Sequence, residues 1–119
     1  MNQYDDSSFD EERRGQIRYD ARLNVNYRQG DTFLYSRSSN VSEMGIFLLS
    51  ETPFPPGSVL ELEFAAPGSR RPIRVTGQVR WVETGREDTE AGMGIQFIDL
   101  KPEVKAQLKS LVRTIAYLE

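Results

Sequence analysis

The sequence predicts an all-β fold in which six antiparallel strands form a small barrel or sandwich capped by one C-terminal helix. Between residues 19 and 97, apolar side chains alternate with polar ones in short segments separated by glycine- and proline-rich turns. This period of two is typical of half-buried strands. After Pro102 the apolar spacing changes to three and four residues, which is typical of a helix with one buried face. Several strands followed by a single helix favour a helix that covers one side of the sheet.

Six strands are expected, each bounded by a turn. Residues 19–27 alternate cleanly, and the Gln29-Gly30-Asp31 turn returns the chain along residues 32–41. The other four strands are expected at residues 44–50, 59–64, 73–82 and 93–97. The proline-rich segment at residues 53–57 separates the third strand from the fourth, because proline cannot donate a hydrogen bond inside a central strand.

The predicted helix begins at Pro102, a residue that suits the first helical turn because its missing N–H has no partner there. Its apolar residues are Val104, Leu108, Leu111, Val112, Ile115 and Leu118. They fall on one face of an amphipathic helix, which is expected to pack against the sheet or against a neighbouring molecule.

Composition excludes several function classes. The chain has 119 residues, which suits one domain with a single core, and its net charge of −3 does not favour nucleic acid or an acidic membrane. It contains no cysteine and no histidine. Without cysteine the chain has no thiolate metal site, and without histidine it lacks the commonest metal ligand and the commonest general base. We expect no catalytic residues, no metal site and no enzymatic activity.

The chain divides into an arm and a domain. Residues 1–12 are acidic and have little to bury, so we expect a flexible N-terminal arm followed by one domain at residues 13–119. The arm differs in composition from a signal peptide, and no apolar run approaches the roughly 20 residues that span a bilayer. A cytoplasmic location is expected.

Arginines gather where the arm meets the first strand. Arg13, Arg14 and Arg18 lie within the segment 13–18. A guanidinium group can bind guanine or phosphate through two hydrogen bonds and can stack on a purine. Taken alone, however, these arginines favour a solvated basic segment that pairs with the acidic arm.

A second polar group lies between the second and third strands. Asn40 and Ser42 stand two residues apart, so on an extended chain both side chains point to one face and offer an amide and a hydroxyl. Gly45 permits a sharp turn or the close approach of another group. Taken alone, this segment favours an ordinary hairpin turn, because turns use the same residue types.

In order along the chain, the two segments resemble the paired signature of the bacterial PilZ family, written RxxxR and then [D/N]xSxxG. Arg14 and Arg18 match the first motif, and Asn40, Ser42 and Gly45 match the second. One strand, a turn and a second strand separate the motifs, which is the spacing of that family. Each motif is weak by itself, but the ordered set is specific.

The similarity extends over about residues 12–112. It includes the Pro56-Gly57 turn, the segments 77–82 and 92–97 and the helix after Pro102. The resemblance implies a six-stranded antiparallel PilZ-like barrel with a C-terminal amphipathic helix.

The resemblance also implies a ligand, cyclic di-GMP, and no cofactor. The implied ligand-binding residues are Arg13, Arg14, Arg18, Asn40, Ser42 and Gly45. The arginines would contact the guanine bases and phosphates, the amide and the hydroxyl would hydrogen-bond the ligand, and the glycine would keep the surface open. Asn40 stands where many members have aspartate, so a negative charge is missing.

The protein is thus expected to be a receptor that relays the second messenger to an unidentified protein partner, with motility, surface attachment or exopolysaccharide production as the usual outputs of the family. One alternative is a PilZ-like protein-interaction module that does not bind nucleotide, against which the intact motifs argue. Another is single-stranded nucleic acid stacked on exposed aromatics. The candidates are Phe33, Tyr35, Phe47 and Trp81. The acidic charge argues against this, and alternating aromatics are more typical of a core.

Overall fold

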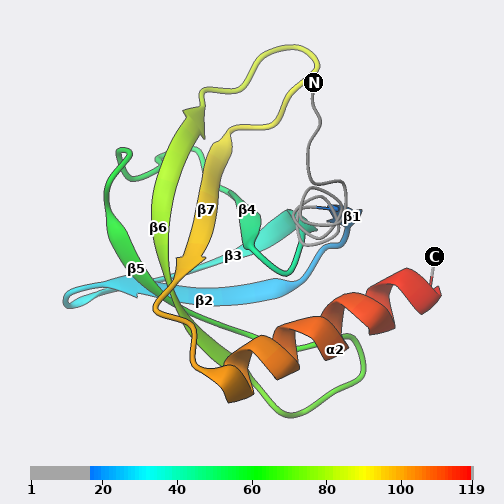
Figure 1. Ribbon diagram of the computed structural model, residues 1–119. Coiled ribbons are helices and arrows are strands. Elements are labelled where there is room, and N and C mark those ends of the chain that lie inside the picture. The colour runs from blue at the N-terminus through cyan, green and yellow to red at the C-terminus, as the bar shows by residue number, and fades with distance from the viewer. Residues whose placement is uncertain (1–16, 119) are drawn as a thin grey trace, which may run out of the picture.

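The computed structural model describes residues 17–118, which form a closed six-stranded antiparallel barrel with one helix packed against it (Figure 1). The elements are β1 (Tyr19–Asp20), β2 (Asn24–Gln29), β3 (Thr32–Val41), β4 (Gly45–Leu49), β5 (Val59–Phe64), β6 (Ile73–Glu83), β7 (Gly92–Ile98) and α2 (Pro102–Leu118). The barrel runs in the order β3-β2-β5-β6-β7-β4 and closes because β4 also pairs with β3. The predicted barrel and helix are confirmed, and the sandwich is excluded.

The first predicted strand, at residues 19–27, is divided into β1 and β2, and Ser38 of β3 lies at the break. The Ser38 hydroxyl accepts a hydrogen bond from the Leu23 N–H at 2.9 Å and donates one to the Ala21 carbonyl. The Ser38 N–H also donates to the Leu23 carbonyl at 3.0 Å. One side chain therefore satisfies the backbone groups that the interruption leaves without ladder partners, and the alternation of buried residues continues into β2.

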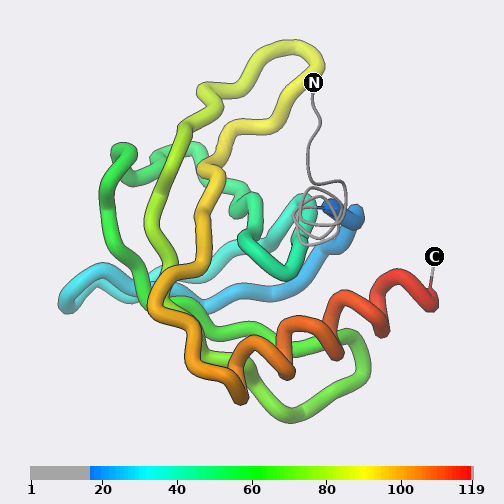
Figure 2. The backbone as a smooth tube through the Cα atoms, viewed as in Figure 1, coloured from blue at the N-terminus to red at the C-terminus, as the bar shows by residue number. Residues whose placement is uncertain are grey.

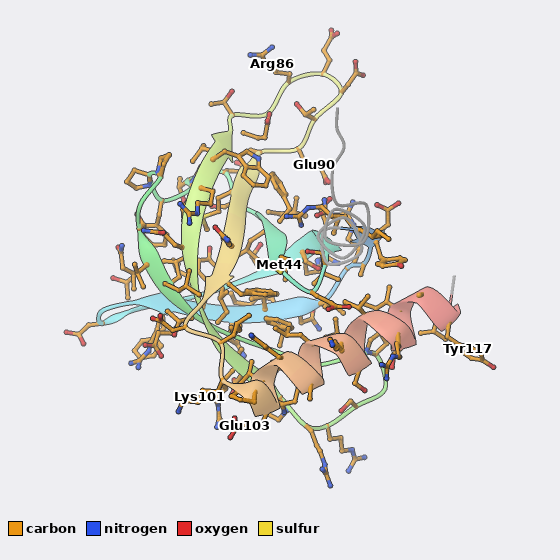
Figure 3. All side chains as sticks on the ribbon, in the orientation of Figure 1. Met44, Arg86, Glu90, Lys101, Glu103 and Tyr117 are labelled. Carbon is orange, nitrogen blue, oxygen red and sulfur yellow. The ribbon has the colours of Figure 1, made fainter. Side chains whose placement is uncertain are left out.

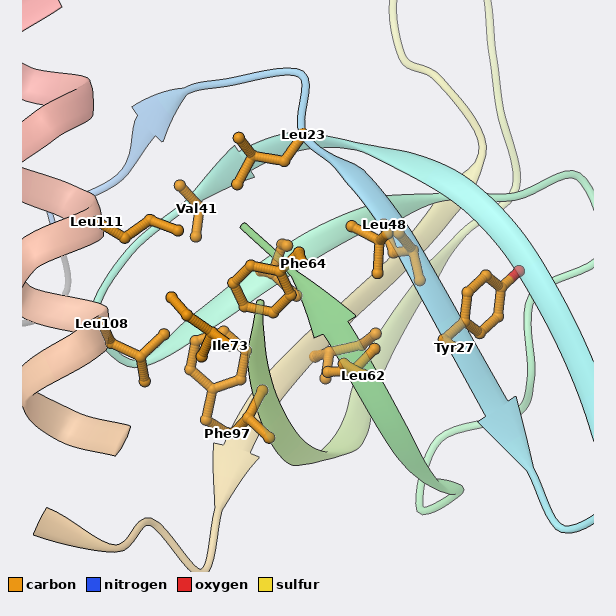
Figure 4. Packing of buried hydrophobic residues seen from close by; sticks show 14 of the residues in the cluster. Leu23, Tyr27, Val41, Leu48, Leu62, Phe64, Ile73, Phe97, Leu108 and Leu111 are labelled. Carbon is orange, nitrogen blue, oxygen red and sulfur yellow. The ribbon is translucent and has the colours of Figure 1, made fainter. Parts of the chain in front are cut away.

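The core fills the barrel and extends to the helix. Figure 4 shows Leu108 and Leu111 of α2 directed toward Val41 and Ile73 of the barrel wall. Both leucines are only 1% exposed, and the helix contacts β6 and β1. The apolar stripe of α2 thus covers its own barrel. No helix within residues 17–118 is both long and apolar enough to cross a membrane.

Three of the four aromatics that alternation assigned to the core are exposed. Phe47 is buried, but Phe33, Tyr35 and Trp81 are 72%, 62% and 41% exposed. For Trp81 the reason is a shift of register between β6 and β7, which falls between Val79 and Trp81 and ends the alternation. Phe33 and Tyr35 lie on the part of β3 that extends past β4.

Gly45 is where β4 joins β7. A Cβ atom added there would lie 2.2 Å from the carbonyl oxygen of Ile95, inside van der Waals contact with rigid backbone. The two strands pair at this point, with Gly45 opposite Gln96. The glycine is therefore needed so that the strands can approach closely enough to close the barrel. The structure thus shows a packing requirement at Gly45, and its role in ligand access stays a prediction.

Replacing Ser38 with alanine should destabilise the fold by about 1–3 kcal/mol, because it leaves the buried Leu23 N–H without a partner. Urea unfolding followed by circular dichroism measures the change. Ser39→Ala is the matched control, since the neighbouring side chain is less buried. Equal midpoints for the two variants would contradict the role of Ser38.

Gly45→Ala should lower the free energy of unfolding by about 3 kcal/mol or more, because the added methyl meets backbone that cannot move without opening the barrel. Gly68→Ala is the control: Gly68 has a φ of 79° but nothing within 4 Å of its Cβ position, so its cost is limited to about 1–2 kcal/mol of backbone strain. In thermal unfolding, the Tm of Gly45→Ala should lie well below the Tm of Gly68→Ala.

Candidate functional site

The turn between β3 and β4 is organised by Ser42. Its hydroxyl accepts hydrogen bonds from the N–H groups of Met44 and Gly45, both at 3.1 Å. The Ser42 N–H donates to the Gly45 carbonyl at 2.9 Å. Ser42 is only 1% exposed, so its hydroxyl is used mainly to build the turn. Met44 lies at the tip of this turn (Figure 3) and is 42% exposed.

Arg18 and Asn40 of the two signature motifs are in direct contact. Nη1 of Arg18 donates to Oδ1 of Asn40 at 2.9 Å. The contact follows from strand pairing, since Arg18 precedes β1 and Asp20 of β1 lies opposite Asn40 of β3. Asn40 is half-buried, and its NH₂ group remains a donor toward the surface. The structure therefore brings together one residue from each motif.

The indole of Trp81 forms an aromatic surface beside Arg18. The Cζ atom of Arg18 lies 5.8 Å from the centre of the indole ring, within range of a cation–π contact. Trp81 lies opposite Gly94 of β7, where an added Cβ would come within 2.3 Å of three indole carbons. The indole can lie across the strand only because residue 94 has no side chain. Trp81 also packs against the buried ring of Phe47, with ring centres 6.3 Å apart.

These groups border a shallow depression of about 310 Å³. The lining residues are Arg18, Ser42, Met44, Arg80, Trp81, Ile95 and Gln96. Nε of Arg80 donates to Oε1 of Gln96 at 2.6 Å, which fixes the second arginine at the rim. The depression thus combines two guanidinium groups, an indole, an amide and two apolar side chains.

The electrostatics of the depression favour an anion. Within residues 17–118 its lining contains two arginines and no carboxylate, although the chain as a whole has a net charge of −3. Burial lowers the pKa of the Arg18 guanidinium, but arginine stays protonated at neutral pH. Desolvation of this kind makes the guanidinium a stronger partner for phosphate or for a purine ring.

A larger depression of about 630 Å³ lies elsewhere, between the β2–β3 and β5–β6 pairs and residues 99–104. Its arginines are already paired: Arg74 with Glu63 at 2.7 Å and Arg28 with Glu61 at 3.7 Å. Because both of its arginines are paired with carboxylates of the same cavity, it offers less to an anionic ligand than the smaller depression. Residues 17–118 contain no group of three acidic side chains placed to hold a metal ion.

Of the predicted ligand-binding residues, Arg18, Asn40, Ser42 and Gly45 converge on the β3–β4 junction. Arg13 and Arg14 lie outside the described residues, as does the predicted arm at residues 1–12. Arg80 and Gln96 were not singled out by the sequence analysis, since strand pairing alone brings them together. Trp81 was singled out, but for nucleic acid and with the core as its expected place.

Comparison with known proteins agrees with this geometry. A family model of the PilZ domain matches residues 12–114. The solved structure of the inhibitor of motility from Bacillus subtilis, MotI/DgrA, has a TM-score of 0.69 and 22% identity, over 82% of this chain and 48% of that one. The chain therefore spans about half of the Bacillus protein. No curated protein matches with significant sequence similarity.

Two isolated PilZ domains are also similar. The PilZ domain of YcgR from Escherichia coli, solved with c-di-GMP, has a TM-score of 0.67 and 18% identity over 86% of this chain and 90% of that one. The PilZ domain of CeSA from a cellulose-synthesizing bacterium has a TM-score of 0.57 and 16% identity over 87% and 98%. At these identities the structures establish a shared fold. Together with the family match over residues 12–114, they show that this chain belongs to the PilZ domain family.

Proposed function

We propose that this protein is a receptor that binds cyclic di-GMP (c-di-GMP) at the depression between Arg18 and Trp81. The observation that carries the proposal is an exposed indole in a depression lined by two arginines that form no ion pair within residues 17–118, next to the Asn40 amide, on the fold for which the YcgR domain was solved with c-di-GMP. The ligand has two flat guanine bases and two anionic phosphates. The depression offers an indole face for one base and two guanidinium groups for the phosphates or a guanine edge.

Three groups in the depression have a proposed chemical role toward that ligand. The Trp81 face stacks with a guanine base, as aromatic side chains do with nucleobases. The guanidinium of Arg18 has five N–H donors and uses one on Asn40, which leaves others for the guanine O6/N7 edge or for a phosphate. Arg80 also lines the depression and is available to a second phosphate.

The remaining motif residues have different parts in the proposal. Arg13 and Arg14 are proposed to complete the contacts to the anionic ligand, and this rests on their match to the family motif. Ser42 and Gly45 are proposed to act mainly through the turn and strand closure that position Asn40, given the hydrogen bonds and the close approach of Ile95.

We further propose that binding, and not catalysis, is the whole of the chemistry at this site. The lining side chains are arginine, serine, methionine, tryptophan, isoleucine and glutamine. None of these is a general base at neutral pH, so no described lining residue could activate the Ser42 hydroxyl. The signal is then passed to a partner protein, with motility or exopolysaccharide production as the output. A cytoplasmic location stays a prediction from composition.

Calorimetric titration with cyclic di-GMP tests the site. Arg18→Ala and Arg14→Ala should each weaken binding by about 10-fold or more, because each removes charge-assisted hydrogen bonds worth about 1.5–3 kcal/mol. Arg74→Ala is the matched control, since Arg74 lines the larger depression and pairs with Glu63; its affinity should equal that of the wild type. No heat and no thermal shift with the wild type would favour an interaction module that does not bind nucleotide.

Trp81 is the only tryptophan in the chain and is 41% exposed, so its fluorescence should report binding directly. Stacking of guanine should quench the emission, with the same midpoint as the calorimetric curve. Trp81→Ala should weaken the binding free energy by about 1–3 kcal/mol, which is the contribution of one stacked base. Unchanged emission at saturating ligand would place the base away from the indole.

Restoring the carboxylate at position 40 provides a further test. Asn40→Asp should tighten binding by a few-fold, because a charged acceptor holds guanine N–H groups and Arg18 more strongly than an amide does. Arg18→Ala combined with Asn40→Asp separates the two effects: a gain that persists without Arg18 comes from direct contact with the ligand. An Asn40→Asp variant that binds more weakly would show that the extra charge repels the phosphates.

A further inference from the structure

Arg80 is the extra residue of a β-bulge in β6. Val79 lies opposite Ile95 of β7, and Trp81 lies opposite Gly94, so Arg80 has no partner of its own across the ladder. Figure 2 shows β6 and β7 side by side along this stretch. A bulge re-aims side chains relative to the regular alternation. Here two successive residues, Arg80 and Trp81, are both exposed and both line the depression.

The bulge brings the Arg80 guanidinium to the side chain of Gln96 on β7. Nε of Arg80 donates to Oε1 of Gln96 at 2.6 Å. Because a guanidinium group can only donate, the amide must turn its oxygen toward Arg80 and its NH₂ group away from it. Within residues 17–118 the amide makes no other hydrogen bond. The residue opposite Gln96 on β4 is Gly45, which has no side chain to cover the amide.

The fixed amide and the guanidinium present only donors to a ligand. The NH₂ group of Gln96 has two N–H groups, and Arg80 uses one of its five on Gln96, which leaves the others for the ligand. The O6/N7 edge of guanine carries two acceptors, whereas the same edge of adenine carries the acceptor N7 and the donor N6–H₂. A pair of groups that only donate therefore matches guanine and leaves the adenine amino group facing another donor.

We propose that Gln96 makes the depression specific for guanine and that Arg80 is its positioning residue. This role of Gln96 rests on the proposed function, because it concerns how the same depression distinguishes one cyclic dinucleotide from another. The Gln96 NH₂ group donates to O6 or N7 of the base that stacks on Trp81. The N–H groups of Arg80 that do not contact Gln96 remain available to a phosphate.

Arg80 determines which base the amide can bind. A glutamine side chain that is able to turn binds adenine through two hydrogen bonds, one accepted from N6 and one donated to N7. The Arg80 Nε–H occupies the oxygen that adenine would need. Without Arg80 the amide can turn, and much of the discrimination between the two bases is lost.

Calorimetric titration with cyclic di-GMP and with its adenine counterpart, cyclic di-AMP, tests the proposal. The two ligands share the ribose–phosphate ring, so the ratio of their dissociation constants reports contacts with the bases and is insensitive to contacts with the phosphates. The wild type should prefer cyclic di-GMP by about 100-fold. Gln96→Met, which keeps the side-chain length but has no N–H donor, should weaken cyclic di-GMP binding by about 10-fold and change cyclic di-AMP binding by less than about two-fold.

Gln78→Met is the matched control. Gln78 lies opposite Gln96 on β6, but its amide donates to the Gly57 carbonyl at 3.3 Å, and it is not among the described residues that line the depression. Its affinities for both ligands should equal those of the wild type. Thermal unfolding verifies that every variant is folded.

Arg80→Met separates positioning of the amide from phosphate binding. Loss of a phosphate contact weakens both ligands by the same factor, whereas release of the Gln96 amide favours adenine, so the ratio should fall by about 10-fold. In the Gln96→Met background, Arg80→Met should leave the ratio unchanged, because the residue through which it acts is already gone. A change of ratio that persists in that background would show that Arg80 does not act through Gln96.

The failure of the receptor function and the failure of the role of Gln96 give different results. A wild type that binds neither ligand is no receptor for cyclic dinucleotides, and both proposals are then wrong. A wild type that binds cyclic di-GMP, with a preference over cyclic di-AMP that Gln96→Met leaves intact, remains a receptor but overturns the role of Gln96.

Discussion

The closure of the barrel at the junction of β3, β4 and β7 is the constraint on which the rest of the structure depends. Ser42 holds the turn, and the Ile95 carbonyl occupies the space that a side chain at Gly45 would need. Because β4 is thereby held between β3 and β7, the polar end of β3 lies next to the aromatic surface on β6 and β7. Packing and recognition are not separable at this junction: the backbone contacts that close the barrel also set the distance between Asn40 and the indole.

The proposed binding surface depends on residues without side chains as much as on those with them. Gly92 and Gly94 alternate along β7, and added Cβ atoms there would collide with Phe47 and Trp81, respectively. The two glycines leave room for an aromatic pair, of which one ring is buried and the other is exposed. Phe47 thus packs against Trp81, and this contact reduces the entropic cost of ordering the exposed ring for stacking.

The sequence was informative where periodicity depends on local structure. The five later strands and the helix after Pro102 were predicted within one or two residues, since alternation and helical spacing are imposed by burial on one face. The sequence was uninformative where pairing with neighbouring strands determines whether a side chain is buried or exposed. The exposure of Trp81 follows from a register shift against β7, and that of Phe33 follows from where β4 ends. The choice between barrel and sandwich came from family resemblance, because it depends on β3 pairing with β4 across the seam.

The shortest strand, β1, lies between the Arg18 side of the barrel and the helix. β1 has two residues, directly follows Arg18, pairs with the Asn40 end of β3 and contacts α2. So short a ladder contributes little stability of its own and yields before the longer strands do. β1 therefore connects Arg18 directly to the helical side of the barrel, through its place in the chain and its contact with α2.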